Sequence, residues 1–271
     1  MKTIVTYWIA VSFICIQGVQ ASDDFIILQS TTSIQNSGLY EKIIPSFERI
    51  TGVRVKIVAV GTGQALHNAA NCNGDVVIVH SPVDEQTFIE SGFGIQPHDL
   101  MYNQFVIVGP SSDPLGIKNI PSVFGAFHRF LEGQAPFVSR GDDSGTHKKE
   151  LEIWSSISAR PQGSWYLEVG SGMGAALNIA VGIGGYTLTD IGTWLNFRNK
   201  QNHDVLLRGG QELFNQYGII LVSPNHCPLV KAELAGQFLE WMISPKGQQL
   251  IRDYRIEDIN LFYPNAKKRI E

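Results

Sequence analysis

The chain has 271 residues, of which 25 are acidic and 21 basic, so its formal net charge is −4 at neutral pH. This charge disfavours nucleic acids and anionic membrane surfaces as partners, because both are polyanions. Three cysteines are too few for a disulfide framework, so the fold must rest on an apolar core. The length suits one large or two modest domains.

The N-terminus has the pattern of a secretory signal peptide. Lys2 supplies a positive charge, residues 4–16 form an almost unbroken apolar run, and Val19-Gln20-Ala21 is a small-residue cleavage site. The apolar run is short for a membrane anchor, which is the alternative interpretation. We therefore expect residues 1–21 to be removed and the protein to be exported, either to a periplasm or out of the cell.

Two cysteines, Cys72 and Cys227, remain after the predicted cleavage. An oxidising compartment permits a disulfide between them, but two small buried hydrophobic residues would fit the sequence equally well. We find no second cysteine or histidine at metal-ligand spacing near either one, so we predict no metal site.

Short apolar strands alternate with helical segments in the first part of the chain. Apolar runs predict strands at residues 25–29 and 75–79, and an alternating pattern at residues 53–57 that continues into residues 58–60 predicts another; helical patterns follow the first two strands in chain order, at residues 39–50 and 65–70. This βαβαβ order, with strands that are apolar on both faces, predicts a parallel sheet covered by helices on both sides.

Two later strands resemble each other and indicate a second lobe. Residues 104–110 and residues 217–224 are both apolar runs that end in proline. We interpret them as crossings, on which the chain leaves the first lobe and later returns to it. The predicted fold class is α/β with two lobes, each a mostly parallel sheet flanked by helices and joined by the two crossing strands. The predicted ranges are residues 22–104 and 218–271 for the first lobe, and residues 105–217 for the second.

Three strand-to-helix turns are rich in glycine, serine and threonine, at residues 30–33, 61–64 and 139–146. In an open α/β sheet such turns gather at the carboxyl edge of the strands, where ligands bind. Each turn alone has an ordinary explanation as a helix cap, because these residue types are common at N-caps. Three in one chain favour a ligand site, with backbone N–H groups and hydroxyls as donors.

The third turn has the composition of an oxyanion site. Arg140 offers a planar fork that suits two oxygens of one tetrahedral anion, and Ser144 and Thr146 offer hydroxyl donors. A plainer role for Arg140 is a surface ion pair with Asp142 or Asp143, which would contribute little stability. In the binding hypothesis, an aspartate orients the guanidinium from behind.

A secreted hydrolase is the alternative from another functional class. Ser144 and His147 are close in sequence, but a spacing of three at a helix start does not by itself make a nucleophile and its base. Residues 141–145 also miss the G-x-S-x-G pattern by one residue, and the seven histidines show no H-E-x-x-H spacing. The sequence therefore favours a binding protein over an enzyme.

Together, these stretches resemble the tungstate-binding (TupA-type) periplasmic proteins of ABC transporters. The resemblance covers nearly the whole mature chain, and it is carried by Thr31-Thr32-Ser33, Val60 to Leu66, Ser139 to His147, Gly172-Met173-Gly174 and Tyr186 to Asp190. It implies a two-lobed periplasmic-binding-protein fold of type II that closes on tungstate, or on molybdate, and delivers it to a membrane permease. We expect a monomer without a cofactor.

The resemblance also implies which residues contact the anion. They fall on the three turns: Thr31, Thr32, Ser33, Thr62, Ser139, Arg140, Ser144, Gly145 and Thr146, with Asp142 behind Arg140. The chain departs from the family pattern at Ser30, where a third threonine is usual, and at residues 181–185, where a charged helical stretch is usual. The first departure keeps a hydroxyl, and the second leaves the end of that helix open.

Phosphate is the nearest rival ligand, since phosphate binders use a similar Arg-x-Asp-x-Ser-Gly-Thr turn. At neutral pH phosphate keeps a proton, so its pocket needs an acceptor, which Asp142 would supply by pointing inward. Tungstate is fully deprotonated and needs donors only, and an inward carboxylate would repel it in a closed site. Selectivity thus depends on whether Asp142 points toward Arg140, which suits tungstate, or toward the ligand, which suits phosphate.

Overall fold

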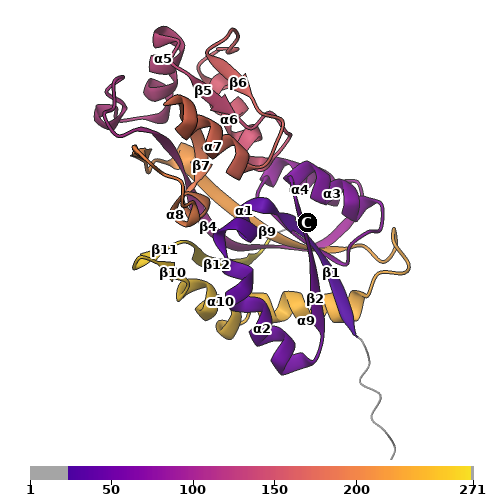
Figure 1. Cartoon of the computed structure of the whole chain (residues 1–271). Coiled ribbons are helices and arrows are strands. Elements are labelled where there is room, and N and C mark those ends of the chain that lie inside the picture. The colour runs from indigo at the N-terminus through magenta and orange to yellow at the C-terminus, as the bar shows by residue number, and fades with distance from the viewer. Residues whose placement is uncertain (1–23, 270–271) are drawn as a thin grey trace, which may run out of the picture.

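Residues 24–269, which the computed structural model describes, fold into two α/β lobes joined by extended strands (Figure 1). The predicted signal peptide, residues 1–21, lies outside the described residues. A ten-stranded sheet runs through both lobes in the order β2-β1-β3-β9-β4-β7-β5-β6, with β12 and β8 each paired to β4. Within residues 24–269, no helix combines the length and the apolarity that a membrane span requires.

The first lobe contains the half of the sheet that begins at β2. β1 pairs in parallel with β2 and β3, as the βαβαβ order predicts, whereas the pairs β3–β9, β9–β4 and β4–β12 are antiparallel. Its strands are β1 (Phe25–Thr31), β2 (Arg54–Val60), β3 (Val76–Val79), β4 (Gly94–Pro110), β9 (Phe214–Val222) and β12 (Tyr263–Lys268), with a hairpin of β10 (Arg255–Ile256) and β11 (Ile259–Asn260). Its helices are α1 (Thr32–Ser37), α2 (Leu39–Thr51), α3 (Thr62–Ala70), α4 (Pro82–Glu90), α9 (Ala232–Ile243) and α10 (Pro245–Arg252).

The second lobe contains the other half of the sheet. β5 pairs in parallel with β6 and β7, and β4 pairs antiparallel with β7 and β8. Its own strands are β5 (Phe137–Ser139), β6 (Tyr166–Glu168), β7 (Tyr186–Asp190) and β8 (His203–Arg208). Its helices are α5 (Val123–Gly133), α6 (Gly145–Ser156), α7 (Met173–Ile183) and α8 (Ile191–Asn196), with short 3₁₀ turns η1 (Ile117–Asn119) and η2 (Gln211–Leu213). The sheet is therefore mixed in each lobe. The parallel pairs agree with the predicted mostly parallel sheet, whereas the antiparallel pairs that the crossing strands make were not predicted.

β4 joins the two halves of the sheet. Its first part pairs with β9 as far as Gln104, which faces Phe214, and its second part pairs with β7 from Phe105, which faces Asp190. β9 pairs with β3 and β4 along its whole length, beginning at Phe214. The predicted ranges of the two lobes remain a prediction. The pairing of β9 favours Phe214 as the residue at which the chain returns to the first lobe, a few residues before the predicted limit at residue 217.

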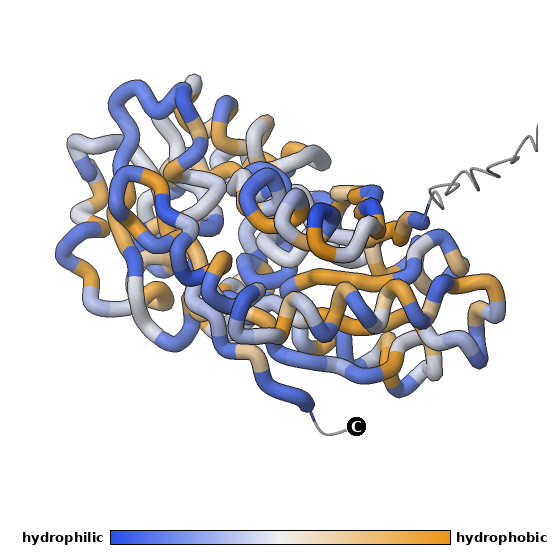
Figure 2. The backbone as a smooth tube through the Cα atoms, turned by 90° about the horizontal axis from the view of Figure 1, so that it is seen from below, coloured by the Kyte–Doolittle hydropathy of each residue, from blue (hydrophilic) through white to orange (hydrophobic). Residues whose placement is uncertain are grey.

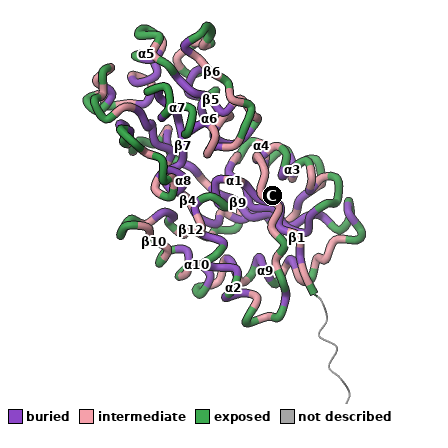
Figure 3. The backbone as a smooth tube through the Cα atoms, in the orientation of Figure 1, coloured by how far each residue is buried: buried purple, intermediate pink, exposed green. Residues whose placement is uncertain are grey.

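The strands are apolar on both faces because helices cover both faces of the sheet. In β3, Val76 and Ile78 pack into a core with α2 and α9, while Val77 and Val79 pack into a second core with α3 and α4. β4 alternates in the same way in the second lobe. Hydrophobic stretches accordingly occur in both lobes (Figure 2), and the central strands are mostly buried, as are parts of the helices that cover them (Figure 3).

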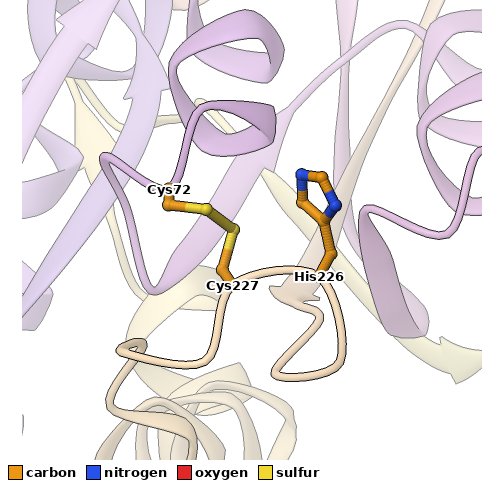
Figure 4. Close-up of side chains that lie close together, drawn as sticks. All are labelled: Cys72, His226 and Cys227. Carbon is orange, nitrogen blue, oxygen red and sulfur yellow. A yellow bond between two sulfur atoms is a disulfide. The ribbon is translucent and has the colours of Figure 1, made fainter.

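Cys72 and Cys227 form a disulfide, with their Cα atoms 5.4 Å apart (Figure 4). The bond ties the loop after α3 to the loop before α9, and so decides between the two alternatives that the sequence left open. A ring nitrogen of His226 and the two sulfurs lie within 4.8 Å of one another, a proximity that the search for metal-ligand spacing overlooked. Because the sulfurs are bonded to each other, neither is a thiolate ligand for a metal.

Candidate anion-binding site

The three predicted turns lie together, although they come from different lobes. β1 leads directly into α1, β2 leads into α3, and β5 leads into α6 through residues 140–144. A Cβ atom placed on Gly61 would lie 3.7 Å from the carbonyl oxygen of Asp142, and one placed on Gly63 would collide with the Asp143 carboxylate. The first-lobe turn at residues 61–64 therefore touches the third turn across the space between the lobes.

The two first-lobe helices present uncapped N-termini toward this region. The residues that precede α1 and α3, Thr31 and Gly61, make no side-chain hydrogen bond to the helix that follows. The first N–H groups of both helices thus lack the usual side-chain acceptor, and the helix dipole favours a negative charge beside them. Both helix starts are suited to an anion.

Four hydroxyl groups of the predicted site are buried and have no hydrogen-bond partner among the described residues. They belong to Thr31, Thr62, Ser139 and Thr146, whose exposure does not exceed 2%. A buried hydroxyl without a partner costs free energy, so such atoms are rare unless they serve a ligand. Two of the four come from each lobe, which places unused donors on both sides of one site.

Arg140 is buried and is held in place by the turn around it. Its Nε donates to the carbonyl oxygen of Ser171 at 3.1 Å, and its Nη2 forms an ion pair with the Asp142 carboxylate. The other oxygen of Asp142 accepts the backbone N–H of Ser144 at 3.3 Å. Because Arg140 is only 3% exposed, the alternative of a surface ion pair is wrong, and Asp142 points toward Arg140.

Ser144 caps helix α6. Its Oγ accepts the backbone N–H of His147 at 3.2 Å, while the His147 Nδ1 accepts the backbone N–H of Asp143 at 3.2 Å. The serine hydroxyl keeps its own proton for donation to a ligand, because capping uses only a lone pair. The two side chains are not hydrogen-bonded to each other in the arrangement of a nucleophile and its base, which removes the sequence argument for a hydrolase.

The remaining predicted residues lie at the helix starts. Thr32 is partly exposed and Ser33 buried in the first turn of α1, and Gly145 is the buried first residue of α6. The departure at Ser30 does not reach the site, because its hydroxyl is hydrogen-bonded to Tyr40 and donates to the Ile78 carbonyl at 3.1 Å. The glycine-rich segment at residues 181–185 includes the last residues of α7 and ends that helix normally, with Gly184 in the left-handed conformation.

A buried carboxyl, Glu150, lies behind the third turn. Burial raises its pKa to about 7, and hydrogen bonds from Tyr166 and Trp154, together with the nearby Ser139 hydroxyl, act in the opposite direction. The Tyr166 hydroxyl and the Trp154 Nε1 donate to Glu150 Oε1 at 2.7 and 3.1 Å. Ser139 lies close enough to influence this carboxyl, but its Oγ makes no hydrogen bond of acceptable geometry with it.

Two residues that the sequence analysis did not assign also join the lobes at this site. Lys148 of α6 pairs with Asp84 of α4 at 2.6 Å and with Asp143 at 3.3 Å. His80, which directly follows β3, lies against Gly145 at the start of α6. His80 occupies the same strand-end position as the predicted turns, a signal that could have identified it, whereas no local pattern marks Lys148.

The chain matches known proteins over most of its length. Residues 18–246 match the family model described as a PBP superfamily domain. The tungstate-binding protein TupA of Peptoclostridium acidaminophilum is 43% identical over 247 residues, which cover 90% of this chain and 86% of that relative.

Two solved structures have the same fold and similar sequences. The tungstate-binding protein TupA of Desulfovibrio alaskensis has a TM-score of 0.78 at 41% identity and covers 90% of this chain, with all of its own chain matched. The tungstate ABC transporter structure from Geobacter sulfurreducens has a TM-score of 0.79 at 42% identity, over 85% of this chain and 98% of its own. The chain therefore belongs to the PBP superfamily and, within it, to the family of the TupA proteins.

Proposed function

We propose that this chain is an exported solute-binding protein that captures one tetrahedral oxyanion between its lobes and delivers it to an ABC permease. The ligand is tungstate, with molybdate as the second choice, in keeping with the names of the relatives. The observation that carries the proposal is the set of buried, unpartnered hydroxyls of Thr31, Thr62, Ser139 and Thr146. A tetrahedral oxyanion offers acceptors in four directions and would use donors from both lobes at once.

The position of Asp142 supports tungstate over phosphate. Each of its carboxylate oxygens already accepts a hydrogen bond inside the turn, one from Arg140 and the other from the Ser144 N–H, so Asp142 is a weaker acceptor for a proton on the ligand. Hydrogen phosphate needs such an acceptor for its proton, while a fully deprotonated anion does not. Arg140, oriented by Asp142, supplies the positive charge.

Export and partners form part of the same proposal. The signal-peptide pattern of residues 1–21 and the Cys72–Cys227 disulfide both fit an oxidising compartment outside the cytoplasm. The relatives with transporter names support a membrane permease as the partner that receives the anion. We propose that the protein acts as a monomer, with the two lobes providing the whole site.

Calorimetric titration of the mature chain with tungstate, molybdate, sulfate and phosphate at neutral pH tests the proposal. We expect tight one-to-one binding of tungstate, weaker or equal binding of molybdate, and no heat from phosphate. Binding of phosphate with no response to tungstate would overturn the choice of anion. Binding of none of the four would overturn the proposed function.

A further inference from the structure

A chain of buried polar side chains crosses from one lobe to the other through the joining strands. It consists of His80, Asn215, Asn103 and Asp190, which we call the hinge chain, and none of its members is more than 5% exposed. His80 follows β3 in the first lobe and Asp190 ends β7 in the second. Asn103 and Asn215 are register partners on β4 and β9. Four buried polar groups at this place need a reason beyond packing.

The hydrogen bonds of the hinge chain have one possible direction. Asp190 Oδ1 accepts the backbone N–H of Thr193 at 3.0 Å, so it is an acceptor, and Asn103 must present its Nδ2 to it at 3.3 Å. The Asn103 Oδ1 then accepts from Asn215 Nδ2 at 2.7 Å, which leaves Asn215 Oδ1 facing His80 Nδ1 at 2.9 Å. Nδ1 must therefore carry the ring proton.

The ring of His80 lies against the first residue of helix α6. A Cβ atom on Gly145 would lie 2.5 Å from Cε1 and 2.8 Å from Nδ1 of His80, so only glycine fits beside the ring. Behind it, the ring packs on Tyr217, with centroids 4.7 Å apart. Burial lowers the pKa of His80 to about 4, with Arg140 acting in the same direction and the Asn215 hydrogen bond opposing. Because the ring is then neutral at neutral pH, His80 does not add a second positive charge beside Arg140.

We propose that His80 is a positioning residue for lobe closure: the hinge chain holds its ring as the Nδ1–H tautomer, and the face of that ring seats Gly145. Closure then brings the first turn of α6, with Gly145 and Thr146, to a fixed distance from the first-lobe turns. This inference rests on the proposed function, because it assigns His80 a part in closing on the anion. The physical basis of this proposal is that closely packed interfaces allow only one relative position of the two lobes in the closed form.

The variant Gly145→Ala tests the contact between Gly145 and the His80 ring directly. Alanine favours a helix over glycine, so the unliganded protein should keep its melting temperature, while the new Cβ meets the His80 ring only when the lobes close. We expect tungstate affinity to fall about tenfold or more, as overpacking of a close contact requires. Gly236→Ala, on α9 with open space around the new Cβ, is the matched control and should bind as the wild type does.

A double variant separates the collision with the His80 ring from other effects of Gly145→Ala on tungstate affinity. His80→Ala combined with Gly145→Ala removes the collision, so the pair should bind tungstate better than Gly145→Ala alone, by about threefold or more. Wild-type affinity in Gly145→Ala, or independent losses in the pair, would overturn the proposal. A wild type that fails to bind tungstate would instead overturn the proposed function.

The ring tautomer is a second readout, and it does not depend on tungstate. We expect ¹⁵N spectra to show His80, assigned by its loss in His80→Gln, with a protonated Nδ1 and a bare Nε2 between pH 6 and pH 8. Asp190→Asn should mix the two tautomers, because an amide at that end no longer fixes the direction of the chain. A wild-type ring that carries its proton on Nε2 would overturn the role of the hinge chain.

Discussion

The two lobes contribute unlike halves of the site. The first lobe offers neutral donors only: two uncapped helix starts and the buried hydroxyls of Thr31 and Thr62. The second lobe offers a charge, Arg140, which is buried and held by Asp142, together with the hydroxyls of Ser139 and Thr146. From this contrast we propose that the attraction for the anion and the selection among anions are concentrated in the second lobe, while the first lobe completes the coordination.

The difference has an energetic consequence. A hydrogen bond to a charged group contributes about 1.5–3 kcal/mol, against about 1 kcal/mol for a neutral one. Substitutions in the second-lobe turn should therefore weaken binding far more than those in the first-lobe turns. The disulfide belongs to the first lobe, whereas buried carboxyl groups with a raised pKa occur in both lobes, Glu85 in the first and Glu150 in the second.

The largest expected effect is that of Arg140→Ala. It removes a charge-assisted contact with the anion, so tungstate affinity should fall roughly 30- to 1,000-fold, equivalent to about 2–4 kcal/mol. Titration calorimetry measures the change. Arg160→Ala, which removes an exposed arginine of the same lobe, is the control. Equal tungstate affinity in Arg140→Ala and Arg160→Ala would break the assignment of the charge to Arg140.

Removal of the disulfide should affect stability and leave the site intact. In the double variant Cys72→Ser/Cys227→Ser, the free energy of unfolding should fall by about 2–4 kcal/mol, because the bond closes a long loop in the unfolded chain. Denaturant unfolding measures this loss. Tungstate affinity should stay within about twofold of the wild type, since Cys72 follows the C-terminal end of α3, whereas Thr62 is at the N-terminal end of that helix. A large loss of affinity would show that the bond also shapes the first-lobe turns.

Glu150 should make the stability of the protein depend on pH. Its pKa is raised from 4.5 to about 7 in the folded chain. The contribution of Glu150 to the free energy of unfolding is therefore fully present below pH 4.5 and is lost as the pH rises through 7. The loss in unfolding free energy is on the order of 3 kcal/mol. In Glu150→Gln, the Oε1 acceptor of Tyr166 and Trp154 remains, and the decline in unfolding free energy between pH 5 and pH 8 should flatten.

Glu152→Gln, an exposed change on the same helix, is the control and should keep the wild-type decline. Glu85, whose pKa burial also raises to about 7, leaves a residual slope in both variants. A slope in Glu150→Gln equal to that of the wild type would contradict the raised pKa.

The smallest expected effect belongs to the first lobe. Thr62→Ala loses one neutral hydrogen bond to the anion, about 1 kcal/mol, or roughly fivefold in tungstate affinity. Thr62→Ser keeps the hydroxyl and should bind within about twofold of the wild type, which makes it the matched control. If Thr62→Ala cost as much as Arg140→Ala, the contrast between the lobes would fail.

Much of the fold follows from local pattern. The strands β1, β2 and β3 and the helices α2 and α3 were predictable, because short apolar or alternating runs indicate strands and apolar residues at helical spacing indicate helices. Helix α4 and the first part of β4, Gly94–Asn103, were not predicted. The latter contains Pro97 and polar residues such as Asp99, and it is held by neighbours that come from distant parts of the chain, β9 and β12.

Part of the candidate site could also be predicted from the sequence, and part could not. The turns could be predicted because three turns rich in glycine, serine and threonine recur after strands, and four of their buried hydroxyls have no hydrogen-bond partner among the described residues. The orientation of Asp142 and the hinge chain could not be predicted. Asn103 and Asn215 meet only through strand register, across 112 residues of chain.

A crystal structure of the mature chain with tungstate tests the central claim most directly, since tungsten is located by its anomalous scattering. We predict one tungstate between the lobes, with its oxygens within hydrogen-bond distance of the hydroxyls of Thr31, Thr62, Ser139 and Thr146 and of the Arg140 guanidinium. Asp142 should remain paired with Arg140. Tungsten bound elsewhere, or an Asp142 carboxylate turned toward the anion, would contradict the account.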